Sequence, residues 1–298
     1  MKRLLAPLLA VLAALASFPA SASVTVVDDV GRTVTLAQPA RRVVSLAPHV
    51  TELLYAAGGG ARLVGAVNYS DYPEAARKLP QVGSYNKLDF ERVLALKPDL
   101  LVVWHSGNPV RQVEQLERLG IPVFHSEPGR LDQIGDSLLR LGRLLGTEPA
   151  AQAAARDYRS RIAALKARYA ARPPVTVFYQ VWPKPLYTLN DDHIAGDMLR
   201  LCGGRNLFGA LKTIAPEVGV EAVIEGDPEV ILVGGRDNPS DPGGKMWQPF
   251  KGMTAVRRGN IFTIDGDLTN RAGPRTADGA AQLCAMLEEA RGRRSSIP

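Results

Sequence analysis

The fold is decided by a stretch that occurs twice: LDFERVLALKPDLLVV at residues 88–103 and VGVEAVIEGDPEVILV at residues 218–233. The two copies align without a gap, so that Glu91 matches Glu221 and proline matches proline. In each copy a short helix is expected to start near the glutamate and to end before the proline, which cannot continue it. The β-branched and leucine run that follows is typical of a buried parallel strand.

A second internal match extends this repeat. ELLYAAGG at residues 52–59 aligns with DMLRLCGG at residues 197–204, and each predicts a helix closed by C-terminal glycines. Each also follows an apolar, strand-like run. These strands are expected at 43–46 and 175–181, further strands at 64–67, 122–124 and 261–264, and further helices at 110–119, 131–145 and 276–290. The alternation predicts an α/β fold of two lobes with mostly parallel sheets, one in each half.

The segment between the halves predicts one long helix, from about 149 to 170. It lacks glycine, and Ala154, Tyr158 and Ile162 keep helical spacing. We expect an N-terminal lobe at 23–147, the linking helix at 148–171 and a C-terminal lobe at 172–298. Because a helical tether is stiffer than a loop, a large hinge closure is not expected.

The first 22 residues are typical of a secretory signal peptide. A basic start, an apolar run too short to span a bilayer and an Ala-Ser-Ala site predict cleavage after Ala22. No cysteine stands at that site to carry a lipid anchor, and no later segment is apolar enough to cross a membrane. We therefore expect a soluble, monomeric protein of the periplasm.

Charge and cysteine content narrow the function. Removing Lys2 and Arg3 with the signal lowers the formal charge from +6 to +4, and the remaining basic residues form no stripe with interleaved aromatics, which argues against a nucleic-acid partner. Cys202 and Cys284 are the two cysteines of the chain. An even pair in an oxidising compartment predicts one disulfide, with two buried free thiols as the alternative.

Aromatic residues recur where the predicted strands end, although aromatics make up 6% of the chain. Ligands of open parallel sheets bind beyond the carboxyl ends of the strands, and flat aromatic walls suit a large, rigid, partly apolar ligand. Simple core filling is the alternative for each ring. The residues are Tyr69, Tyr85, Trp104, Trp182 and Tyr187. His49 and His105 also follow strands, either as axial ligands to a metal in the bound molecule or as structural histidines.

Six motifs carry a resemblance that covers nearly all of residues 42–287. They are SLAPHVTEL at 45–53, YSDYP at 69–73, LKPDL at 96–100, GNPVRQV at 107–113, CGGRNLF at 202–208 and RAGPR at 271–275. With them the chain resembles the periplasmic cobalamin-binding proteins of ABC importers, within the class III solute-binding proteins that also serve haem and siderophores.

The resemblance implies two α/β lobes bridged by a helix, a corrinoid held between them, and a disulfide between Cys202 and Cys284. It also implies that Glu91 and Glu221 dock the lobes onto arginines of the importer's permease subunits. A matched pair of acids on two similar lobes suits a two-fold symmetric transporter. The alternative is that each glutamate is a first-turn acid favoured by its helix dipole.

For the ligand, the resemblance transfers to Tyr69, Tyr85, Trp104, Tyr187 and Arg271. Tyr85 replaces a tryptophan and Tyr187 a phenylalanine, whereas Ala215 and Leu268 stand where the family carries tryptophans; Trp182 is expected to fill part of that space. A smaller corrinoid such as cobinamide, or haem or a metal-siderophore in the same fold, therefore stays open. Any such molecule is cargo rather than a cofactor.

Catalytic motifs are missing from the sequence. It has no dinucleotide-binding glycine motif after the first strand, no phosphate-binding loop, no nucleophile elbow and no zinc-spaced His/Cys cluster. We therefore expect a binding protein that captures its ligand reversibly and not an enzyme.

Overall fold

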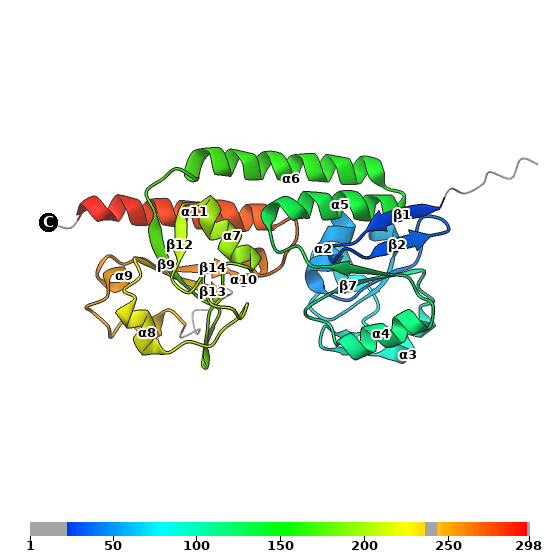
Figure 1. Cartoon of the computed structure of the whole chain (residues 1–298), viewed down its shortest axis with the longest axis horizontal. Coiled ribbons are helices and arrows are strands. Elements are labelled where there is room, and N and C mark those ends of the chain that lie inside the picture. The colour runs from blue at the N-terminus through cyan, green and yellow to red at the C-terminus, as the bar shows by residue number, and fades with distance from the viewer. Residues whose placement is uncertain (1–22, 236–242, 297–298) are drawn as a thin grey trace, which may run out of the picture.

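The computed structural model describes residues 23–235 and 243–296, so the predicted signal peptide lies outside the described residues. Each lobe is built on a four-stranded parallel sheet (Figure 1). In the first lobe the order is β4-β3-β7-β8, from Leu63–Ala66, Val43–Ser45, Leu100–Trp104 and Val123–Ser126. In the second the order is β12-β9-β13-β14, from Gly204–Asn206, Val175–Gln180, Val230–Gly235 and Ile261–Asp265. Equivalent strands therefore occupy equivalent places, which confirms the predicted fold class.

The internal matches mark a true structural repeat. Helix α2 (Pro48–Ala56) precedes β4 in the first lobe, and α7 (Ile194–Leu201) precedes β12 in the second. In the same way, α3 (Phe90–Ala95) precedes β7, and α8 (Val220–Glu225) precedes β13. The backbone repeats too, because the residue before each matched proline is left-handed: φ is 45° at Lys97 and 36° at Asp227. The remaining helices on the sheets are α4 (Val110–Arg118), α9 (Thr254–Arg257) and α10 (Gly266–Thr269).

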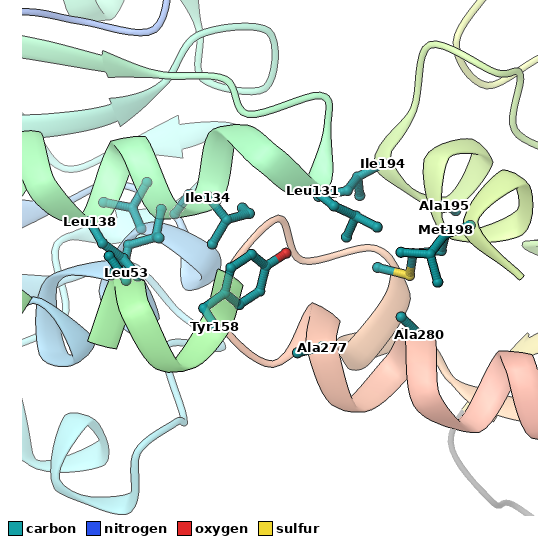
Figure 2. Close-up of a cluster of buried hydrophobic side chains, with 14 of the residues drawn as sticks. Leu53, Leu131, Ile134, Leu138, Tyr158, Ile194, Ala195, Met198, Ala277 and Ala280 are labelled. Atoms are coloured by element: carbon teal, nitrogen blue, oxygen red, sulfur yellow. The ribbon is translucent and has the colours of Figure 1, made fainter. Parts of the chain in front are cut away.

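Three long helices join the lobes. Helix α6 (Glu148–Tyr169) spans both of them and lies on α5 (Leu131–Leu145) and α11 (Thr276–Gly292) (Figure 1). One buried cluster runs through the junction: Figure 2 shows Tyr158 of α6 between Leu53 and Ile134 of the first lobe and Ala277 of α11. The linking helix is therefore packed along its length instead of hanging between two independent cores. The exact division into lobes at 147 and 171 stays a prediction.

Several short elements have no counterpart in the sequence-based expectations. They are the hairpins β1–β2 (Val24–Val27, Thr33–Leu36), β5–β6 (Gly83–Ser84, Lys87–Leu88) and β10–β11 (Trp182–Pro183, Leu186–Tyr187), strand β12, and 3-10 turns at Gly60–Arg62, Glu74–Lys78, Lys245–Trp247 and Arg293–Ser296. Runs of two to five residues carry too few side chains to show a period.

The expected disulfide is present, between Cys202 at the end of α7 and Cys284 in α11. It ties the second lobe's sheet-covering helix to the C-terminal helix. Within residues 23–235 and 243–296, every helix is too short or too polar to serve as a membrane span.

Candidate functional site

The carboxyl ends of the strands open onto a cavity of about 80 Å³ that both lobes line. Its walls come from the segments that follow the strands and from the N-termini of α2 and α7, as the strand-end rule predicts. The first lobe contributes His49, Trp104 and Glu127, and the second contributes His193, Ile194 and Asn270.

Trp104 is positioned by its own loop. Its ring lies against Gly107, where a Cβ atom would stand 2.0 Å from the indole, so a side chain at that position would displace the ring. The Asn108 side chain accepts from the Trp104 backbone N–H at 2.7 Å and donates to the carbonyls of Leu46 and Tyr85, at 2.8 and 2.7 Å. One amide therefore fastens three strand-end loops together. It also holds Tyr85 beside Trp104, with ring centroids 5.8 Å apart.

His49 completes this wall from beneath. Its ring meets Trp104 edge to face, with centroids 5.5 Å apart, and its side chain has 5% exposure. Burial, with the nearby Arg271 guanidinium, lowers the pKa of His49 to about 3. Its Nε2 finds no hydrogen-bond partner among the described residues. The imidazole is therefore neutral, and its unpaired nitrogen is buried beside the cavity.

His105, unlike His49, does not lie at the cavity wall. Its Nδ1 lies 3.3 Å from Nδ1 of His125, and among the described residues it is not part of the cavity lining. The two histidines that the sequence grouped as axial-ligand candidates are therefore separated, because the turn after β7 directs His105 towards the neighbouring strand β8.

The other predicted aromatics are not among the described residues that line this cavity. Tyr69 is 69% exposed and has a left-handed backbone with φ of 62°, a conformation that costs a non-glycine residue energy and is common at functional sites. Trp182 is 60% exposed and pairs with the half-buried Tyr187 across the β10–β11 hairpin. Cross-strand partners share one face, so these two rings form a second aromatic surface.

Arg271 is held by acids from both lobes. It contacts Glu52 Oε1 at 3.2 Å and Asp71 Oδ1 at 2.8 Å in the first lobe, and Asp267 Oδ1 at 3.1 Å in its own. Glu52 also binds Arg275, at 2.6 and 2.9 Å, and Arg275 in turn stacks on the ring of Tyr72. We call Glu52, Asp71, Asp267, Arg271 and Arg275 the inter-lobe ion cluster.

Glu91 and Glu221 occupy the second positions of α3 and α8, and both are exposed. The two helices lie on the same side of the molecule, away from α6 (Figure 1). The repeat-related glutamates therefore belong to one face, each on its own lobe.

A family model described as periplasmic binding protein matches residues 43–268, which is most of the chain. This chain belongs to the periplasmic binding protein family. The family is one of solute-binding proteins and not of enzymes.

Within the family, this periplasmic binding protein is similar to proteins whose ligands are named. Vitamin B12-binding proteins of Vibrio cholerae and Yersinia pestis are 37% and 39% identical to it over 251 residues, which is 84% of this chain and 90% and 88% of theirs. The solved periplasmic vitamin B12 binding protein BtuF of Vibrio cholerae superimposes with a TM-score of 0.80 at 37% identity, over 85% of this chain and 98% of that one. A periplasmic heme-binding protein from Pseudomonas aeruginosa gives 0.72 at 30% identity, over 83% and 92%.

The inter-lobe acids of this periplasmic binding protein were missed from the sequence, although the repeat contained a signal. Glu52 aligns with Asp197 in the second internal match. Glu52 pairs with second-lobe arginines, whereas Asp197 accepts the Leu131 backbone N–H at 2.9 Å and pairs with Arg130 at 3.7 Å, both in the first lobe. Each lobe therefore extends an equivalent acid to the other.

Proposed function

We propose that this chain captures cobalamin or a closely related corrinoid between its lobes in the periplasm and delivers it to an ABC importer. The observation that carries the proposal is the wall of Trp104, Tyr85 and His49, fixed by Asn108 at the strand ends of a cavity that both lobes line. The identity of 37–39% to vitamin B12-binding proteins over most of both chains supports the corrinoid as cargo.

The rings supply most of the recognition. Trp104 and Tyr85 present faces to a flat macrocycle, and the exposed Tyr69 and the Trp182–Tyr187 surface approach it from the rims. Arg271 is fixed by carboxylates of both lobes, and its guanidinium would bond the amide or phosphate groups of a corrinoid. Capture is reversible and needs no covalent step.

A haem or other iron macrocycle is the second candidate. His49 favours it: this residue lines the cavity as a neutral imidazole, and its buried, unpaired Nε2 would be an effective ligand to iron as well as cobalt once the side chain turned it towards the cargo. The heme-binding protein of 30% identity has the same fold. The two cargoes are distinguished by import.

The experiment reconstitutes the importer encoded with this chain in lipid vesicles and supplies the mature protein with cyanocobalamin, cobinamide or haemin. We expect import of a corrinoid that depends on the mature protein. Comparison of the two corrinoids shows whether the nucleotide tail matters at a site with Ala215 and Leu268. Import of haemin alone would contradict the proposal and assign the chain to haem.

The docking role of Glu91 and Glu221 is tested in the same vesicles. The double variant E91A/E221A should lose import while it binds the ligand as tightly as wild type, since both side chains lie outside the cavity. The matched control is E74A/E289A, which removes one exposed acid from each lobe away from α3 and α8 and should import normally. Unchanged import by E91A/E221A would refute docking through these residues.

A further inference from the structure

His105 and His125 form a pair on the outer edge of the first lobe's sheet. His125 lies in β8 opposite Val103 of β7, and His105 follows β7 by one residue, so parallel pairing brings the two rings together. Their Nδ1 atoms are 3.3 Å apart, and the ring centroids are 5.3 Å apart at an interplanar angle of 74°. Neither residue belongs to the cavity lining among the described residues.

The spacing is that of two ligands on one metal ion. With Zn–N bonds of about 2.0–2.1 Å in tetrahedral geometry, two ligand nitrogens stand about 3.3–3.4 Å apart. Once the ring radius is added, the same geometry sets the ring centroids about 5.2 Å apart. Both values agree with the observed pair, so an ion can replace the proton that the two nitrogens share without a large side-chain movement.

Two neighbours compete for Nε2 of His125. Glu117 of α4 places Oε1 3.0 Å from this nitrogen, where the carboxylate can accept the Nε2 proton of the tautomer whose Nδ1 lone pair is available to an ion. A carboxylate behind a histidine ligand is the usual outer partner in zinc sites. Arg32 places an N–H donor 2.9 Å from the same nitrogen, which favours the other tautomer, so metal binding requires His125 to turn its Nε2 proton to Glu117 while Arg32 keeps its 3.2 Å ion pair with that carboxylate. Asp28, which accepts the His125 backbone N–H, adds a further negative charge.

Access and ligand number define the kind of site. His125 has 7% side-chain exposure, whereas His105 is exposed, so an ion reaches the two Nδ1 atoms from the His105 side. No group of three or more His, Cys, Asp or Glu side chains suited to a metal occurs among the described residues. The protein therefore supplies two nitrogens, and water fills the remaining positions.

We propose that His105 and His125 bind one divalent transition-metal ion, Zn²⁺ being the probe of choice, through their Nδ1 atoms, with Glu117 as the positioning residue. Imidazole nitrogen suits zinc and its neighbours in the first transition row. On binding, the proton between the two Nδ1 atoms leaves Nδ1, and the solvent-exposed His105 takes up a proton on Nε2, so both imidazoles stay neutral. The site is separate from the cargo cavity and does not depend on what the cavity binds.

The test is calorimetric titration of Zn²⁺ into the untagged, chelator-treated mature protein at pH 7.5. One ion should bind per chain. H105A, an exposed change that spares the fold, should abolish binding, and so should H125A. E117Q should weaken binding about tenfold because the outer partner is altered. E114Q, on the same helix but paired with Arg118, should bind like wild type.

Nitrogen NMR of the imidazoles supplies a second readout, since zinc should shift the Nδ1 resonances of His105 and His125 and leave those of His49 and His193 in place. Cyanocobalamin affinity should not change in H105A, which separates this site from the proposed function. Absence of zinc binding by wild type, or equal binding by H105A and wild type, would overturn the proposal.

Discussion

Glu52 is a carboxylate with 1% side-chain exposure at the contact between the lobes, where it accepts hydrogen bonds from Arg271 and Arg275. Removing one member of such a group leaves an uncompensated buried charge, which costs more than the pair itself contributes. E52Q should therefore lower the free energy of unfolding by about 3 kcal/mol, as measured by urea denaturation of the mature protein.

The matched control is D136N, which removes the partner of Arg159 at an exposed contact between α5 and α6. That change should cost less than about 1 kcal/mol, because exposed ion pairs contribute little. If E52Q were no more destabilising than D136N, the inter-lobe ion cluster would not hold the lobes as we infer.

Buried histidines make the stability depend on pH. Burial lowers the pKa of His49 to about 3 and that of His193 to about 4, whereas an unfolded histidine titrates near 6.5. As the pH falls from 6.5 towards these values, the histidines are protonated in the unfolded chain but not in the folded chain, so the free energy of unfolding falls. Between pH 7 and pH 5, each histidine should lower the free energy of unfolding by about 2 kcal/mol.

The measurement compares wild type with H49Q in denaturant titrations at pH 7 and pH 5. H49Q should lose about 2 kcal/mol less than wild type over this interval, since glutamine does not titrate. A histidine that is accessible and protonated in the folded protein would instead give parallel losses in both proteins.

The direction in which a side chain points at the end of a strand could not be predicted from the sequence. The strand-end rule predicted Trp104, Tyr85 and His49 near the crevice; Trp104 and His49 line the cavity, and Tyr85 packs beside Trp104. It could not separate His105 from them, because β7 is buried on both faces and shows no alternation that extends past its end. The turn that positions His105 is held by Glu127, which follows β8 and accepts hydrogen bonds from the Ser106 backbone N–H and hydroxyl 21 residues earlier in the chain.

At the scale of elements, the repeat was readable because proline and glycine fix where helices end. The matched prolines stop α3 and α8, and the paired glycines follow α2 and α7 in both lobes. Strand β12 was missed because Gly204–Asn206 contains no apolar side chain and is specified by its pairing with β9. The internal repeat was the one sequence feature that pointed to β12, because this strand occupies the place in the second sheet that β4 occupies in the first.

The disulfide makes a prediction for two of these elements. Cys202 and Cys284 are 82 residues apart in sequence, and closing a loop of that length restricts the unfolded chain by about 4 kcal/mol. C202S/C284S should lower the free energy of unfolding by that order in urea denaturation. Wild type in a reducing agent should behave like the variant, and a loss below about 1 kcal/mol would show that the packing of α7 on α11 suffices without the bond.

Over the whole molecule, three connections restrain the lobes: helix α6, the continuous core around Tyr158, and the acids that each lobe extends to the other. The sequence predicted the helix. The shared core and the ion cluster join residues more than 100 positions apart, which no local pattern reveals. Lobes restrained in this way meet a ligand with largely preformed walls.

The most direct test of corrinoid capture in this cavity is calorimetric titration of cyanocobalamin into the mature wild-type protein and its W104A variant. We predict saturable binding of one ligand per wild-type chain and at least about tenfold weaker binding by W104A, because the variant loses the central ring of the aromatic wall. No binding by wild type, or equal binding by the two proteins, would contradict the account.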